Sequence, residues 1–240
     1  MERVRLQNSS NHLIEEHLNR YVFASRFCGS KIVLDLACGI GYGSRILRSS
    51  GSKESIGVDL SRNAIAYAGM HYPECNFFVM DATQPGFCRG IFDVICSFET
   101  IEHVRKYEKY LSEMKNLLKP GGLFIISTPL KEAWSPYGNR SANIYHIKEF
   151  SQKEFCSVIG SFFHIVGLYG QGLCSVRRFI LYPYEVLTIR ILGRKKVFLD
   201  KILNALKVMR NRDDLRVVPF KKSRFTVPKY IIAVCEKPPK

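Results

Sequence analysis

The chain has 240 residues and a formal net charge of +15, and 46% of its residues are hydrophobic. This length and composition predict one globular domain with a full core, and they exclude a fibrous or wholly disordered protein. No uncharged apolar stretch reaches the roughly 18 to 20 residues that a membrane-spanning helix needs, and residues 1–20 lack the apolar core of a signal peptide. We therefore expect a cytoplasmic location.

The basic charge is concentrated near the carboxyl end of the chain. Residues 177–240 contain 17 Lys and Arg against 5 Asp and Glu, so they carry +12 of the total charge. Apolar residues are interleaved with Lys and Arg over residues 190–216, a pattern typical of a helix that lies on an anionic membrane surface. A solvated helical surface is the plain alternative. Nucleic acid is not an expected partner, because a charge patch without a recognisable binding module is weak evidence.

The first part of the chain predicts alternating helices and strands. Residues 11–27 place apolar side chains near helical spacing, which predicts an amphipathic helix. Apolar, β-branched runs then predict five strands, which are KIVLDLACG (31–39), SIGVDL (55–60), NFFVMDA (76–82), FDVICSF (92–98) and LFIISTP (123–129). The intervening helices are expected over residues 44–51, 61–72 and 106–118, and the last should stop at the breaker KPGG (119–122).

The second part predicts a loop and two further strands. A polar, aromatic loop over residues 131–150 precedes a helix over 151–160 and strands over 162–170 and 229–237. The pattern predicts an α/β fold with a doubly wound, seven-stranded sheet. We expect a core over 31–130 and an acceptor-side lid over 131–240. A basic helical insertion over 177–224 should precede the last strand.

Glycines and acidic residues mark the ends of the first three strands. The loop GIGYG follows the first strand, and without a Cβ at Gly39 and Gly41 the backbone can turn tightly and approach a ligand. Asp35 lies in the first strand, whereas Asp59 and Asp81 end the second and third. Nicotinamide dehydrogenases also carry a glycine loop and an acid after the second strand, but they do not explain Asp81.

The segment VLDLACGIGYGS (33–44) resembles the first motif of the class I S-adenosylmethionine-dependent methyltransferases, and SFETIEHV (97–104) and LKPGGLFIISTP (118–129) extend the resemblance to the type 11/12-like group. The resemblance implies a Rossmann-like fold, mostly parallel with an antiparallel last strand, and S-adenosyl-L-methionine as cofactor. It also implies a helix over residues 11–30 that closes over the cofactor through Arg20 and Tyr21. The implied cofactor-binding residues are Asp35, Ala37, Gly39, Gly41, Asp59, Leu60, Asp81, Ala82, Ser97 and Phe98.

Methyl transfer to a hydroxyl needs a group that removes a proton, and two histidines are candidates. His146 lies in the loop after the fifth strand, and His103 follows the fourth strand; either imidazole can serve as general base near neutral pH. Each could instead fix a loop by hydrogen bonds. The segment NIYHIKEFSQKEF (143–155) resembles methyltransferases of glycan synthesis, which methylate sugar hydroxyls, and also quinone-biosynthesis O-methyltransferases. The glycan interpretation is preferred.

No metal site is expected from the sequence. Glu99, Glu102 and His103 come close to a metal-binding cluster, but they share one short segment without a clear second acid from elsewhere. The eight cysteines form no C-x-x-C pair and no cluster at zinc spacing, so we expect them to be reduced.

Three alternatives to a glycan methyltransferase stay open. One is a quinone or other small-molecule O-methyltransferase, and another is a cofactor-binding protein that has lost catalysis. The third is a nucleic-acid methyltransferase. Enzymes that methylate amino groups of nucleic acids carry N-P-P-Y or D-P-P-Y after the fourth strand, whereas this chain has SFET (97–100), which argues against this alternative.

Overall fold

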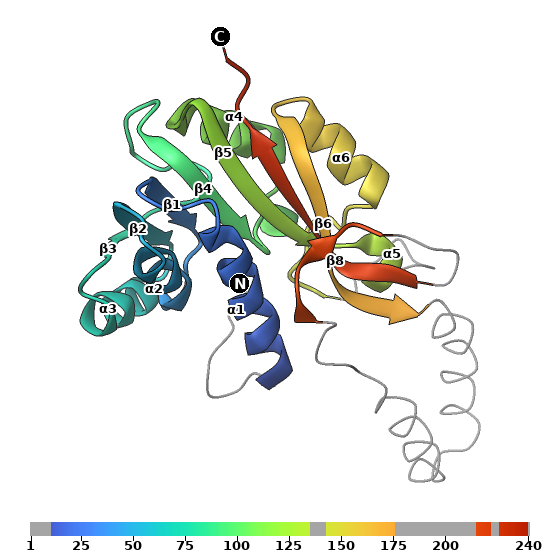
Figure 1. Ribbon diagram of the computed structural model, residues 1–240, viewed down its shortest axis with the longest axis horizontal. Coiled ribbons are helices and arrows are strands. Elements are labelled where there is room, and N and C mark those ends of the chain that lie inside the picture. Colours follow the sequence, from blue (N-terminus) through green and yellow to red (C-terminus); the bar gives the residue numbers. More distant parts are fainter. Residues whose placement is uncertain (1–10, 135–142, 176–214, 222–225, 240) are drawn as a thin grey trace.

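The computed structural model describes residues 11–134, 143–175, 215–221 and 226–239, which form a mixed α/β domain (Figure 1). Eight strands make one sheet in the order β3-β2-β1-β4-β5-β8-β6-β7. The strands are β1 (Ile32–Leu36), β2 (Glu54–Asp59), β3 (Asn76–Val79), β4 (Phe92–Phe98), β5 (Leu118–Pro129), β6 (His164–Ser175), β7 (Val218–Pro219) and β8 (Thr226–Glu236). The expected Rossmann-like fold is confirmed.

The first five strands are parallel, and the rest of the sheet is antiparallel. β1 pairs with β2 on one side and with β4 on the other, so the strand order reverses beside β1. β8 runs antiparallel to both β5 and β6, as predicted for the last strand. Ligands of doubly wound sheets bind beyond the carboxyl ends of the strands at such a reversal point. The fold therefore directs a ligand to the ends of β1, β2 and β4.

Helices pack on both faces of the sheet (Figure 1). They are α1 (Asn11–Ser25), α2 (Tyr42–Ser49), α3 (Arg62–His71), α4 (Tyr107–Leu117), α5 (Lys131–Trp134) and α6 (Gln152–Gly160), with a short 3-10 helix η1 (Ile101–His103). Successive residues of β1 point to opposite faces, as a strand requires. Val33 packs in a cluster with Tyr21 of α1, whereas Leu34 packs with Tyr110 of α4 and Phe155 of α6.

The sheet differs from the expectation in two places. The segment KPGG does not break the chain between helix and strand, because β5 begins at Leu118, directly after α4. A register shift in the pairing of β4 with β5, between Phe92 and Val94, accommodates these residues. The sheet has one strand more than the seven expected. This additional strand, β7, lies inside the predicted basic insertion and pairs with Tyr169 and Gly170 of β6. Most of that insertion, residues 177–214 and 222–224, lies outside the described residues.

Within the described part of the chain, each helix is too short or too polar to cross a membrane.

Candidate active site

The turn after β1 places two glycines in different environments. Gly39 has a φ of 56° and Gly41 a φ of 85°, a region that favours glycine. A Cβ on Gly39 would have no heavy atom within 4 Å, and Gly39 lines a cavity. A Cβ on Gly41 would instead lie 2.6 Å from Ala68 Cβ and 2.8 Å from the Phe77 ring. Gly39 therefore fits the expected close approach to a ligand, whereas Gly41 is required by packing against α3 and β3.

Asp59 at the end of β2 fixes the loop that carries Gly39. Its Oδ2 accepts a hydrogen bond from the Gly39 amide at 3.0 Å, and its Oδ1 accepts one from the Ser61 amide at 2.8 Å. Asp59 is only 6% exposed, yet it lines the cavity. Because each carboxylate oxygen has two lone pairs, both oxygens can accept a further bond from a ligand hydroxyl.

Asp35 is buried behind the cavity wall, where it is hydrogen bonded to two neighbouring side chains. Its two carboxylate oxygens accept hydrogen bonds from Tyr21 Oη at 2.9 Å and from Ser44 Oγ at 2.7 Å. Burial raises the pKa of Asp35 to about 7, while these two hydrogen bonds oppose that rise. Asp35 thus joins α1, β1 and α2. Asp35 is not among the residues that line the cavity, and its expected contact with the cofactor stays a prediction.

The cavity extends over the carboxyl ends of the strands and has a volume of about 1210 Å³. Of the expected cofactor-binding residues, seven line it, namely Ala37, Gly39, Asp59, Leu60, Asp81, Ala82 and Phe98. Both expected catalytic histidines, His103 and His146, line it as well. The three remaining residues, Asp35, Gly41 and Ser97, lie behind the wall; the Ser97 hydroxyl is hydrogen bonded to Tyr110 Oη at 2.6 Å.

One wall of the cavity is formed by α1, which is anchored to the antiparallel strands. His17 and Tyr21 line the cavity, and the buried Arg20 donates to Gln171 Oε1 of β6 at 2.6 Å. The Arg20 guanidinium also lies over the Tyr230 ring, 4.6 Å from its centroid. Of the two residues expected to close over the cofactor, Tyr21 lines the cavity and Arg20 does not; closure over the cofactor stays a prediction.

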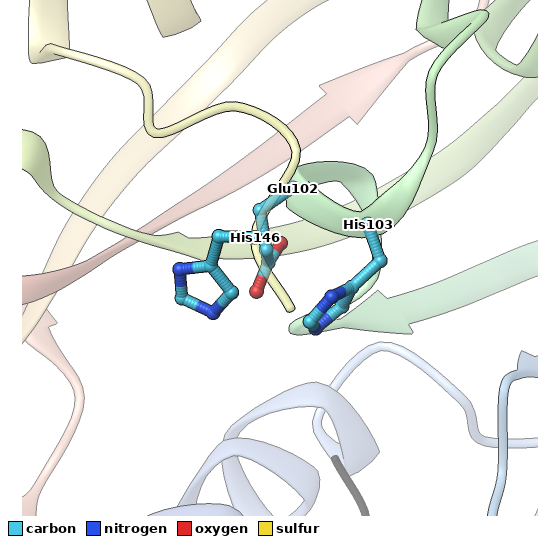
Figure 2. Close-up of side chains that lie close together, drawn as sticks. All are labelled: Glu102, His103 and His146. Atoms are coloured by element: carbon cyan, nitrogen blue, oxygen red, sulfur yellow. The ribbon is translucent and has the colours of Figure 1, made fainter. Parts of the chain in front are cut away.

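Glu102, His103 and His146 meet at the other end of the cavity (Figure 2). One ligand atom from each side chain lies within 4.8 Å of those of the other two. The two imidazole rings have their centroids 5.0 Å apart and stand nearly perpendicular, at 71°. Glu102 comes from η1 beside His103, whereas His146 comes from a loop 43 residues further along the chain.

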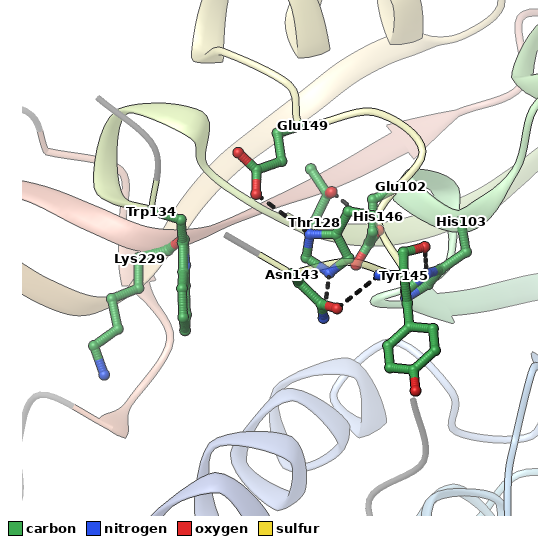
Figure 3. Close-up of polar contacts among 9 residues, drawn as sticks. All are labelled: Glu102, His103, Thr128, Trp134, Asn143, Tyr145, His146, Glu149 and Lys229. Atoms are coloured by element: carbon green, nitrogen blue, oxygen red, sulfur yellow. Dashed lines mark hydrogen bonds and ion pairs between the residues drawn. The ribbon is translucent and has the colours of Figure 1, made fainter. Parts of the chain in front are cut away.

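Hydrogen bonds hold this loop against η1, and Figure 3 shows the one between His103 and Tyr145. The amides of Ile147 and Lys148 both donate to the Glu102 carbonyl oxygen, at 2.8 and 3.1 Å. In return, His103 Nδ1 lies 2.9 Å from the Tyr145 carbonyl oxygen. These bonds place the ring of His146 beside the Glu102 side chain.

The half-buried Glu99 and the buried Glu102 lie near the histidines, and the sequence predicts neither as a site residue. Burial raises the pKa of the Glu99 carboxyl, and the positive charge of Arg20 opposes that rise. Burial raises the pKa of Glu102 well above its usual range, and the neighbouring charge of Glu99 adds to it. Glu99 has a φ of 51°, and its Oε1 accepts a hydrogen bond from Ser127 Oγ at 2.7 Å. Backbone strain of this kind clusters at functional sites.

Comparison with known proteins places the described fold among methyltransferases. Residues 34–126 match a family model described as a methyltransferase domain. A probable S-adenosylmethionine-dependent methyltransferase of Mycolicibacterium smegmatis is 26% identical over 149 residues, which are 62% of this chain and 58% of that protein. The chloroplastic tocopherol O-methyltransferase of Arabidopsis thaliana is 38% identical over 104 residues, which are 41% of this chain and 30% of that protein.

A solved structure extends the similarity to nearly the whole fold. An S-adenosylmethionine-dependent methyltransferase from Mesorhizobium loti superposes with a TM-score of 0.60 at 15% identity, covering 92% of this chain and all of that chain. At this identity the match shows the fold alone. The chain spans little more than half the length of the mycobacterial relative, 58%.

Proposed function

We propose that this chain, whose residues 34–126 match a methyltransferase-domain model, transfers the methyl group of S-adenosylmethionine to a hydroxyl oxygen of a sugar, a glycan or a related small molecule. The observation that carries the proposal is a single cavity lined by Gly39 and Asp59 at the first strand ends and also by His103 and His146. A methyl donor and an acceptor can share such a cavity.

The residues at the strand ends fit the cofactor. The open space in front of Gly39 leaves room for its methionine part against the backbone. Asp59 would accept the ribose hydroxyls, and Asp81 with Ala82 would hold the adenine edge. When bound, the cofactor would supply a methyl group on a sulfonium, so that an acceptor lone pair attacks the methyl carbon in line and the sulfur leaves as a neutral thioether. The chain contributes mainly by aligning the two reactants.

The other end of the cavity fits an acceptor that carries hydroxyl groups. The nitrogen atoms of His103 and His146 can accept hydrogen bonds from such groups. Trp134, which is 43% exposed, and Ile144, which is 87% exposed, also line the cavity and offer apolar surface to a ring. Since a hydroxyl is mostly un-ionised at neutral pH, we assign its activation to the two histidines.

A small-molecule O-methyltransferase, including one of quinone synthesis, is the second candidate. The relative named tocopherol O-methyltransferase, 38% identical over its matched residues, favours it. Both candidates predict methylation on oxygen, so they differ in the acceptor and not in the chemistry.

Methyl-labelled S-adenosylmethionine, incubated with the full chain and fractionated cell extract, tests the proposal. Label should enter the glycan or small-molecule fraction, and mass spectrometry should locate the new methyl group on oxygen. His146→Ala should lower the rate by about 10²-fold or more, in the range of proton-transfer catalysis, with unchanged cofactor affinity. The matched control is His164→Ala, because His164 is an exposed residue at the start of β6.

Two outcomes would overturn this proposal. Label in nucleic acid alone would identify the chain as a nucleic-acid methyltransferase. Cofactor binding without transfer to any fraction would favour a binding protein that has lost catalysis.

A further inference from the structure

At the acceptor end of the cavity, one buried carboxylate oxygen lies beside two imidazole rings. The Glu102 side chain is fully buried, and its Oε2 accepts a hydrogen bond from Thr128 Oγ1 at 3.0 Å. Its Oε1 has no hydrogen-bond partner among the described residues. In Figure 2 the carboxylate lies between the rings of His103 and His146. A buried, unpartnered carboxylate oxygen is costly unless a positive group or a donor joins it.

The hydrogen bond of His103 determines which of its nitrogens is available. Nδ1 faces the Tyr145 carbonyl oxygen at 2.9 Å. Because a carbonyl oxygen can only accept, Nδ1 must carry the hydrogen. In the neutral ring Nε2 then has a free lone pair. A backbone carbonyl behind Nδ1 is the usual arrangement for a histidine that binds a metal through Nε2.

His146 is oriented in a similar way, by a carboxylate (Figure 3). Its Nδ1 lies 3.5 Å from Glu149 Oε1, and its Nε2 lies 3.1 Å from Asn143 Nδ2. The Asn143 amide group is the donor here, since its Oδ1 already accepts from the Tyr145 amide at 2.9 Å. Nε2 of His146 therefore presents a lone pair, with a carboxylate behind the ring as in many zinc sites.

We propose that Glu102, His103 and His146 form a binding site for a divalent transition-metal cation of the zinc type. Two imidazoles and one carboxylate are a ligand set of catalytic zinc sites, which keep a fourth position for water or substrate. Mg²⁺ prefers oxygen ligands in near-ideal octahedral geometry, so it should bind more weakly here.

Binding requires a modest contraction of the site. A tetrahedral Zn²⁺ with bonds of about 2.1 Å holds its ligand atoms ~3.4 Å apart, so the present separations of up to 4.8 Å must shorten. Asn143 must also release His146 Nε2. Both histidines are only partly buried, which leaves their rings room to turn.

The cation would give the proposed methyl transfer its activating group, and this part of the inference rests on the proposed function. A cation at this point draws electron density from the acceptor hydroxyl and lowers its pKa, as zinc does for water. The proton passes to solvent, and the O–C bond forms as the S–C bond breaks. His146 then acts as a ligand, in place of the general base expected from the sequence.

Metal binding is tested on the full chain without reference to turnover. After treatment with a chelator, calorimetry with Zn²⁺ should show one site per chain that Mg²⁺ does not compete for at equal concentration. His103→Ala and His146→Ala should each weaken Zn²⁺ binding by at least about tenfold, since loss of an outer partner alone costs 10–100-fold. His164→Ala is the control, and unchanged S-adenosylmethionine affinity shows that each variant is folded.

Co²⁺ distinguishes this site from the cysteines. A Co²⁺ complex of Glu102, His103 and His146 should lack a thiolate charge-transfer band. Such a band, absence of Zn²⁺ binding to the unmodified chain, or a Zn²⁺ affinity in both variants equal to that of the unmodified chain would overturn the metal site. Full turnover by the metal-free chain would overturn the activating role but leave the proposed function in place. Failure of the proposed function would show instead as absent methyl transfer with metal bound.

Discussion

Replacing each glycine of the β1 turn by alanine separates a ligand-facing position from a packing position. Both residues have positive φ, which costs an alanine about 1–2 kcal/mol. At Gly39 this is the main cost, because the new methyl group enters open space. At Gly41 the methyl group also meets Ala68 and Phe77, and such overpacking adds about 1–3 kcal/mol.

For a chain of this size, 1 kcal/mol corresponds to a shift in Tm of roughly 2–4 °C. We therefore expect Gly39→Ala to lower Tm by ~2–8 °C and Gly41→Ala by ~4–20 °C. S-adenosylmethionine at about 100 times its Kd stabilises a folded protein by ~2.7 kcal/mol, and a tenfold loss of affinity leaves ~1.4 kcal/mol. The cofactor-induced rise in Tm should thus be retained in Gly41→Ala and fall to about half or less in Gly39→Ala.

Thermal unfolding with and without S-adenosylmethionine measures both quantities on the same samples. A full cofactor-induced rise in Gly39→Ala would show that the open space before Gly39 is not the cofactor site. A lost rise in Gly41→Ala with an unchanged Tm would show that Gly41 contacts the ligand rather than α3 and β3.

Three further predictions concern other parts of the chain. Asp59→Ala should weaken S-adenosylmethionine binding, because it removes the proposed ribose acceptor and releases the Gly39 amide; unchanged affinity in calorimetry would contradict this. Burial raises the pKa of Asp35 to about 7, so the folded state binds more protons than the unfolded state between about pH 4 and pH 7, and stability should fall as pH rises through this window. Asp35→Asn should flatten that part of the denaturation profile, and an unaltered slope would assign the dependence to other groups. Residues 190–216, of which 190–214 lie outside the described residues, should bind anionic vesicles in a salt-sensitive manner, at about 1 kcal/mol per engaged cation. Sedimentation should show release on substitution of four residues by Gln, and equal binding to neutral vesicles would refute the electrostatic contribution; these residues are Arg194, Lys195, Lys196 and Lys201.

The sequence predicts the parallel half of the fold well, because each strand there is an uninterrupted apolar run. Sequence-based prediction fails where pairing between strands overrides the local conformational preference of the residues. Gly121 and Gly122 lie within β5 because the bulge opposite Phe92 and Val94 absorbs them. Likewise, β7 has only two residues, Val218 and Pro219, and they form a strand only through their pairing with β6. Neither the bulge nor so short a strand has a pattern that sequence periodicity can detect.

The two ends of the cavity also differ in how well the sequence predicts them. The residues proposed to bind the cofactor at strand ends, such as Asp59 and Ala82, are placed by local structure, so a motif and its spacing are enough to bring them to the cavity. The acceptor end depends on a contact between distant segments, in which the Glu102 carbonyl accepts the amide of Ile147. The sequence assigns both histidines to the acceptor side, but it gives no sign that His146 comes within 4.8 Å of Glu102 and His103. An expectation of no metal was reasonable from adjacency alone, and only the tertiary contact supplies the third ligand on which the proposed cation site depends. The acceptor chemistry should therefore respond to changes in residues 143–149 that leave the cofactor end untouched.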